Sequence, residues 1–250
     1  MSLAGLGAVI VWNDIAPELR EDFFEWHPRQ HMPERLSLPG FLRGRRCVAV
    51  DSAESGMAAT VEFFTLYEVA DLAVLDSEIY KTRLAHPTEW SLKVMPGFVN
   101  NVRGGCRVLA SYGQMLGGLA LTIRLVFADD AARSAAVSTL SGWLPDAMAQ
   151  PRIVGVHLLA NDPALAGGQV GTRQGRFISQ PDVVLLLEGS TVDGLRQAAD
   201  TVFGKQRLKG LVGAAPDVLR DMFRLEYSLQ KLASGAFEAP SVTKAFQPPG

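Results

Sequence analysis

Residues 8–27 read AVIVWNDIAPELREDFFEWH and contain a strand pattern followed directly by a helix pattern. The first five residues form an apolar run with β-branched side chains, which is typical of a strand. Pro17 stands where a helix can begin, and apolar residues follow it at spacings of four and three as far as Trp26. We expect this helix to end at His27, because Pro28 disfavours helical geometry in the residue before it.

The rest of the first half continues the alternation of strands and helices. Apolar runs and turn residues predict strands at 45–50, 60–67 and 107–112. Val69, Leu72, Ala73 and Ile79 share one stripe and predict a second helix before the last strand. The predicted order is β-α-β-β-α-β, which is the ferredoxin-like unit.

The second half repeats this order. The patterns predict strands at 121–127, 153–159, 182–188 and 218–229. One helix follows a cap at Asp129 or Asp130 and is ended or bent by Pro145, and another follows a cap at Ser190. We expect one unit over residues 1–116, a second over 117–235, a flexible glycine-rich loop at 167–175 and an extended tail over 236–250.

The predicted fold class is α+β. A β-α-β-β-α-β unit places both helices on one face of its sheet and leaves the other face uncovered. Val61 and Phe63 lie on one side of a predicted strand and Phe64 and Leu66 on the other, which indicates that both faces are buried. We therefore expect two tandem ferredoxin-like units packed sheet to sheet as an intramolecular dimeric α+β barrel, whose centre can hold a small molecule.

Composition excludes several classes of partner. The chain has 250 residues with 24 Lys and Arg against 26 Asp and Glu, so its net charge of -2 gives no field that would attract nucleic acid. We expect no membrane segment, because the apolar stretch 116–127 is interrupted by Arg124. Cys47 and Cys106 form neither a disulfide framework nor a zinc spacing, which favours the cytoplasm. A homodimer stays open, through helices or sheet edges.

One segment resembles a known family. Residues 24–36 read FEWHPRQHMPERL and are closed by Pro39-Gly40-Phe41, with an aromatic residue before a histidine–proline pair. This is similar to the helix-end signature of EthD-like proteins in the dimeric α+β barrel superfamily, and residues 86–90, HPTEW, resemble uncharacterised tandem members of that group. The superfamily includes cofactor-free monooxygenases, lactone isomerases, polyketide cyclases and haem proteins, so the resemblance implies a fold group more than a reaction.

The densest polar cluster supplies the candidate catalytic residues. His31 titrates near neutrality and is the candidate acid or base, with Glu34 as its orienting partner and Arg35 or Arg45 as a stabiliser of an anion. The alternative interpretation is structural: His31 and Glu34 cap or bridge a loop, and Arg35 is solvated.

The candidate ligand-binding residues are apolar, aromatic or cationic. They are Trp26, His27, Arg45, Tyr67, His86 and Trp90. The spacing of four between His27 and His31 suits a metal on a helical face, but a break at Pro28 would turn the rings apart. We therefore predict no metal and no cofactor.

Three functions remain open from the sequence. The first is binding of a small apolar or aromatic molecule in the barrel, with cofactor-independent oxidation, isomerisation or cyclisation as the chemistry. The second is a non-catalytic ligand-sensing or assembly module whose barrel is plugged by side chains. The third is a haem-binding barrel with His157 as the iron ligand, by analogy with haem-binding relatives.

Overall fold

The computed structural model describes residues 3–165, 180–212 and 218–231. The elements of the first half are β1 (Gly7–Ile15), η1 (Pro17–Leu19), α1 (Arg20–Trp26), η2 (His27–His31), α2 (Met32–Ser37), β2 (Phe41–Ala49), α3 (Ser52–Ser55), β3 (Phe63–Val69), η3 (Leu72–Asp76), α4 (Glu78–Ala85), α5 (Glu89–Val94), η4 (Met95–Gly97) and β4 (Phe98–Gly113). Those of the second half are β5 (Leu119–Leu125), α6 (Asp130–Met148), β6 (Ile153–Asn161), β7 (Val183–Gly189), α7 (Val192–Val202), α8 (Lys205–Val212) and β8 (Leu219–Gln230).

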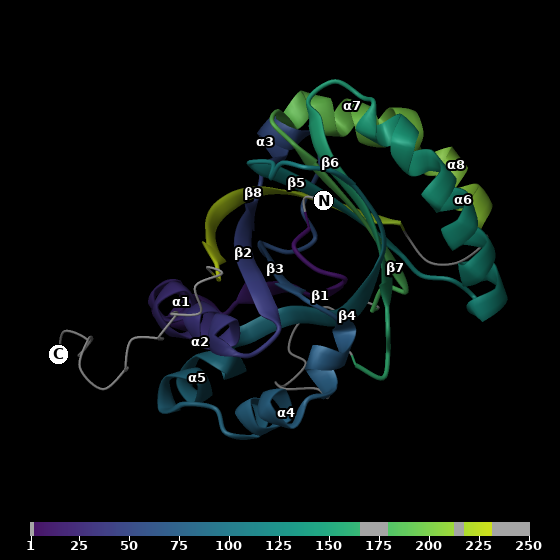
Figure 1. Cartoon of the computed structure of the whole chain (residues 1–250). Coiled ribbons are helices and arrows are strands. Elements are labelled where there is room, and N and C mark those ends of the chain that lie inside the picture. Colours follow the sequence, from purple (N-terminus) through teal and green to yellow (C-terminus); the bar gives the residue numbers. More distant parts are fainter. Residues whose placement is uncertain (1–2, 166–179, 213–217, 232–250) are drawn as a thin grey trace.

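The eight strands close into one barrel in the order β1-β3-β2-β8-β5-β7-β6-β4. Each half contributes the strand order of a ferredoxin-like unit, and antiparallel pairing of β2 with β8 and of β4 with β6 joins the halves. Apart from α3, which lies beside α7, the helices of the first half lie on one side of the barrel, and α6, α7 and α8 lie on the opposite side (Figure 1). The predicted α+β barrel within a single chain is therefore confirmed.

Both faces of the sheet are buried, as the apolar strand patterns predict. The interior contains a cluster in which the Phe64 ring lies 5.4 Å from the ring of Trp12 and 5.3 Å from that of Phe223. Alternate residues point outward and pack under the helices, as Tyr67 and Val69 do on β3. Side chains thus occupy the middle of the barrel, and the outer face of the sheet meets the helices.

The predicted end of the first helix at His27 is wrong. His27 keeps helical dihedral angles (φ −63°, ψ −49°), and the chain passes through the π-helix η2 into α2. Pro28 is the second residue of η2 and lacks the backbone N–H that would donate to the preceding turn, yet the helix continues through it. The Met32 N–H bonds the His27 carbonyl, which closes the wider turn and keeps His27 and His31 on one helix.

Other predicted boundaries shift. The second predicted helix is divided among η3, α4 and α5, and Ile79 of its predicted apolar stripe is 56% exposed. Asp129 caps α6 as predicted, but this helix continues through Pro145 to Met148, and Thr191 rather than Ser190 caps α7. The predicted glycine-rich loop at 167–175 and the tail at 236–250 lie outside the described residues.

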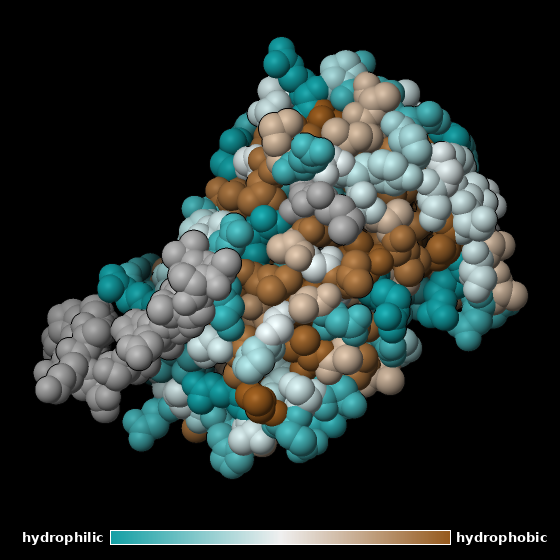
Figure 2. All heavy atoms as spheres, in the orientation of Figure 1, coloured by the Kyte–Doolittle hydropathy of each residue, from teal (hydrophilic) through white to brown (hydrophobic). Residues whose placement is uncertain are grey.

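None of the helices in the described part of the chain is both long and apolar enough to cross a membrane. On the face seen in Figure 2, hydrophobic residues gather across the middle and hydrophilic residues lie mostly toward the periphery. Among the described residues, the exposed large hydrophobic ones are Leu6, Ile79, Leu92, Leu109, Tyr112, Met115 and Leu116.

Candidate functional site

The π-helix η2 carries His27 and His31 over the outer face of the barrel. Their ring centroids lie 5.5 Å apart, and the His31 ring lies 4.3 Å from the Trp26 ring at an angle of 31°. The neighbouring α2 approaches β2 closely, because a Cβ at Gly44 would lie 3.0–3.1 Å from Leu36 and Met32. π-Helical turns inserted between α-helices are frequent at functional sites.

A chain of hydrogen bonds joins His27 to the second half of the protein. The Tyr227 hydroxyl lies 2.7 Å from His27 Nδ1 and 3.2 Å from a terminal nitrogen of Arg46. Arg46 can only donate, so the Tyr227 oxygen accepts from it and its O–H is available for Nδ1. This arrangement assigns the remaining proton of a neutral His27 to Nε2. Burial, and then the charge of Arg46, lower the pKa of His27 well below its ordinary value.

Arg46 is itself fully buried on the helix side of β2. Its guanidinium carbon lies 4.4 Å from the ring centroid of Phe23 and 4.6 Å from that of Phe63. Its Nε lies 2.8 Å from a carboxylate oxygen of Glu226. The aromatic faces and the carboxylate compensate a cation in a place where an isolated charge would be very costly.

Besides two nitrogens of Arg46, three enclosed polar atoms in this cluster have no hydrogen-bond partner among the described residues. They are His31 Nδ1, the Tyr67 hydroxyl oxygen and one terminal nitrogen of Arg35. The His31 and Tyr67 rings lie 6.3 Å apart. Burial lowers the pKa of His31 well below its ordinary value, and the charges of Arg35, His27 and Arg83 lower it further. The site therefore presents a neutral imidazole beside a phenol and a guanidinium.

The structure does not bring Glu34 or Arg45 into contact with His31 as predicted. The Glu34 carboxylate pairs with Arg83 and makes no described hydrogen bond with His31, so it is not the direct orienting partner of His31. Burial raises the pKa of Glu34, with Arg83 acting in the opposite direction. Arg45 points into the barrel, because strand alternation places it on the face opposite Arg46, and it cannot join the cluster around His31.

Inside the barrel, Arg45 belongs to a second polar network. Its guanidinium lies 3.1 Å from Glu68 and 2.9 Å from Glu188. His157 Nε2 lies 3.4 Å from the same Glu188 oxygen, and its Nδ1 lies 2.9 Å from the Ser111 hydroxyl. Burial alone would raise the pKa of Glu188, but the hydrogen bond with His157 and the charge of Arg45 bring it to about 2. Because both nitrogens of His157 have partners, this residue is not free to ligate haem iron.

Two further predicted ligand-binding residues differ in position. His86 is exposed at the end of α4, where its ring nitrogen Nδ1 lies 2.9 Å from the Thr82 carbonyl oxygen. Trp90 on α5 packs with the hydrophobic cluster that contains Phe23 and Trp26. Trp90 therefore borders the site, and no described contact brings His86 to it.

Arg46, Arg83 and Tyr227 are members of the cluster that the sequence analysis does not single out. Alternation along β2 was a usable signal for Arg46, because a neighbour of Arg45 must face the other side of the sheet. Tyr227 lies opposite Arg46 in the pairing of β2 with β8, across 181 residues of sequence. Such a contact depends on barrel closure, which no local pattern reveals.

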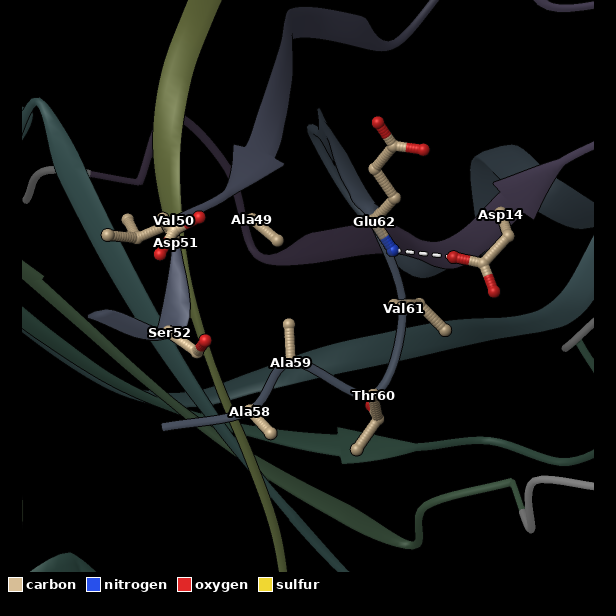
Figure 3. Close-up of a pocket in the computed structure, with 10 residues that line it drawn as sticks. All are labelled: Asp14, Ala49, Val50, Asp51, Ser52, Ala58, Ala59, Thr60, Val61 and Glu62. Carbon is tan, nitrogen blue, oxygen red and sulfur yellow. Dashed lines mark hydrogen bonds between the residues drawn. The ribbon is translucent and has the colours of Figure 1, made fainter. Parts of the chain in front are cut away.

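A pocket of about 480 Å³ lies apart from this cluster, where the segment before β3 meets the ends of β1 and β2 (Figure 3). Its acidic groups already have partners. Asp14 accepts hydrogen bonds from the Glu62 backbone N–H at 2.6 Å and from Asn100 at 2.5 Å, and Glu62 pairs with Arg20. The Asp51 carboxylate caps α3. The pocket's carboxylates therefore have structural roles.

Comparison with known proteins identifies the fold. No protein-family model matches the chain, and no curated protein matches it in sequence. The crystal structure of an anthrone oxidase-like protein superposes with a TM-score of 0.62 at 10% identity, over 92% of this chain and 95% of that one. A proposed monooxygenase from Fusobacterium nucleatum subsp. nucleatum gives 0.56 at 9% identity, over 92% and 96%. A proposed monooxygenase from Lactobacillus acidophilus gives 0.50 at 11% identity, over 90% and 95%. The chain shares with these proteins an α+β barrel fold.

Proposed function

We propose that the cluster under η2 binds a small aromatic molecule and that His31 removes a proton from it, in an oxidation by O₂ that uses no cofactor. One observation carries the proposal: His31 Nδ1, the Tyr67 hydroxyl and an Arg35 nitrogen are enclosed together without partners. Buried polar atoms are nearly always satisfied in native proteins, so such a group of them suits a bound molecule. Trp26 and Trp90 supply aromatic surface beside it.

The chemistry begins at an activated C–H bond. A neutral His31 accepts the proton, and the Arg35 charge and the Tyr67 hydroxyl stabilise the enolate oxygen that results. For an anthrone, the anionic carbon forms a C–O bond with O₂, and the His31 proton completes a hydroperoxide. Loss of water then breaks the O–O bond and leaves the quinone, so that anthrone and O₂ give anthraquinone and water. Isomerisation and cyclisation begin with the same removal of a proton.

The other predicted assignments enter this proposal in revised form. Burial and the charge of Arg46 keep His27 neutral, the Tyr227 hydroxyl holds its ring, and Glu34 acts by fixing Arg83. The His27–Pro28 signature together with the α+β barrel fold supports EthD-like membership, which is part of the proposal. The homodimer and the cytoplasmic location stay predictions.

The test is oxygen uptake by the full-length chain with anthrone as substrate, in the presence of EDTA. We expect one O₂ to be consumed for each anthraquinone formed, at a rate far above that in buffer alone. A rate equal to the buffer rate would reject the oxidation, and a rate that depends on added haem would reject its cofactor independence.

The proposed base also predicts the pH dependence of activity. Because burial and nearby cations lower the pKa of His31, its neutral form persists below pH 6.5. We therefore expect kcat/KM for anthrone oxidation to stay level from pH 7.5 to below pH 6.5 and to fall only as the pH passes through the lowered pKa. A profile that halves near pH 6.5 would show an unperturbed histidine and contradict this role.

The packed interior favours one second candidate function. Trp12, Phe64 and Phe223 fill the middle of the barrel, as expected for a ligand-sensing or assembly module with a plugged interior. Such a module would bind the aromatic molecule at the same outer site without turnover. Binding in calorimetry with no oxygen uptake would favour this function.

A further inference from the structure

Arg35 differs from the other arginines of the helix-covered cluster in its charge balance. Arg46 is paired with Glu226 and Arg83 with Glu34. Within the described part of the chain, Arg35 has no carboxylate within 4 Å, and one of its terminal nitrogens is enclosed without a partner. Its guanidinium carbon lies 5.9 Å from the ring of Tyr80. Among the described residues, Arg35 is therefore a guanidinium without an ion pair of its own, and the Glu34 carboxylate, which pairs with Arg83, attracts it only from a greater distance.

The Tyr67 hydroxyl is a second hydrogen-bond donor near this guanidinium. Tyr67 is only 4% exposed, and its hydroxyl has no described partner. Burial raises its pKa, and among the charges around it Arg35 opposes this effect most strongly. The Phe41 ring lies 6.1 Å from the Tyr67 ring and 5.6 Å from the Tyr80 ring. Two unused hydrogen-bond donors thus lie beside aromatic faces, which suits an acceptor group carried on a ring.

The strand register shows that Tyr67, Arg46 and Tyr227 lie on one side of the barrel and have apolar counterparts on the other side. The position equivalent to Tyr67 is Leu187, since these residues lie opposite Val9 and Leu121 in their own halves. In the same way Leu158 and Ala110 occupy the positions of Arg46 and Tyr227. All three belong to or pack against the hydrophobic core of the second half. The equivalent place there is filled by core side chains.

From these observations we infer that this site binds one aromatic ligand for each chain through an oxyanion, such as the enolate of the proposed reaction or a carboxylate, which accepts hydrogen bonds from Arg35 and Tyr67. The inference rests on the location of the site in the proposed function and adds the charge and number of the ligand. A planar guanidinium beside a hydroxyl donor matches an oxyanion, and charge-assisted hydrogen bonds of this kind are about twice as strong as neutral ones.

The test uses 2-naphthoate and its neutral isostere 2-naphthamide as probes, in calorimetric titrations of the full-length chain. We expect 2-naphthoate to bind with a stoichiometry of one and roughly 10- to 100-fold more tightly than 2-naphthamide. Arg35→Gln should abolish this preference and Arg35→Lys should restore it in part, because lysine keeps the charge but lacks the planar fork. Arg133→Gln, which removes the same charge from α6, should leave the preference unchanged.

Several outcomes would overturn the inference. These are equal affinity for the two probes, no binding of 2-naphthoate at millimolar concentration, two bound molecules for each chain, or a preference that survives Arg35→Gln in a variant with wild-type thermal stability. The proposed oxidation fails separately: a chain that turns over anthrone without preferring 2-naphthoate keeps the oxidation and loses the anion inference. A chain that prefers 2-naphthoate without consuming oxygen does the reverse.

Discussion

Glu188→Gln is expected to lower the free energy of unfolding by about 3–5 kcal/mol, because it removes one charge from a buried ionic network. The Glu188 carboxylate is fully buried and lies 2.9 Å from a guanidinium nitrogen of Arg45 and 3.4 Å from His157 Nε2. Its other oxygen accepts a hydrogen bond from the Gly117 backbone N–H at 2.9 Å. Glutamine keeps the shape but leaves Arg45 with Glu68 as its remaining carboxylate partner.

The measurement is thermal and urea unfolding of the wild type and the variant. At this chain length the loss corresponds to a fall in Tm of roughly 6–20 °C. Glu54→Gln serves as the control, since Glu54 forms an exposed ion pair with Arg224, and exposed pairs contribute at most about 1 kcal/mol. Equal Tm changes in the two variants would show that the buried network does not stabilise the barrel.

The same carboxylate predicts how stability changes in acid. The folded pKa of Glu188, about 2, lies below its ordinary value of 4.5, so the folded state binds this proton less readily than the unfolded state. The associated stabilisation, about 3 kcal/mol, is fully present above pH 4.5 and is lost as the pH falls toward 2. Between pH 4.5 and pH 2 the free energy of unfolding of Glu188→Gln should therefore fall less steeply with pH than that of the wild type. The difference in slope corresponds to at most one bound proton.

The fold could be predicted from the sequence because its patterns are local. Alternation over 121–127 and the apolar run 182–188 each correspond to a strand of the barrel, β5 and β7. At Pro28 the same kind of reasoning failed. The rule for residues before proline describes a local preference, whereas packing of Trp26 and His27 against the sheet keeps the chain helical. The outcome is a π-helix, which has no simple sequence signature.

The candidate site could be predicted only where its residues are close in sequence. Trp26, His27, His31 and Arg35 lie within ten positions, and the structure keeps them on one continuous helical segment. The sequence left the face of Arg45 open because no turn fixed the phase of β2, and a change of one residue transfers a strand side chain to the other face. The partners of His27 depend on the closure of the barrel, so they required the structure.

His31→Ala is expected to lower kcat/KM for anthrone oxidation by 10²–10⁴-fold, because general-base catalysis typically contributes that much. The enclosed Nδ1 has no described partner, and the lowered pKa keeps the ring neutral at pH 7. The structural interpretation makes a different prediction. If the His31 ring matters only by packing on Trp26, the substitution would lower stability by about 1 kcal/mol and leave turnover by the folded protein unchanged.

His31→Gln separates the two interpretations, since glutamine keeps polar volume beside Trp26 but cannot accept the proton at neutral pH. We expect its Tm to stay within a few degrees of the wild type while oxygen uptake falls as in His31→Ala. His86→Ala is the matched control, because His86 is exposed and its ring nitrogen bonds its own helix, so both quantities should stay unchanged. Full activity in His31→Gln would assign the proton transfer to another group, and a lower Tm with unchanged turnover would make His31 a packing residue.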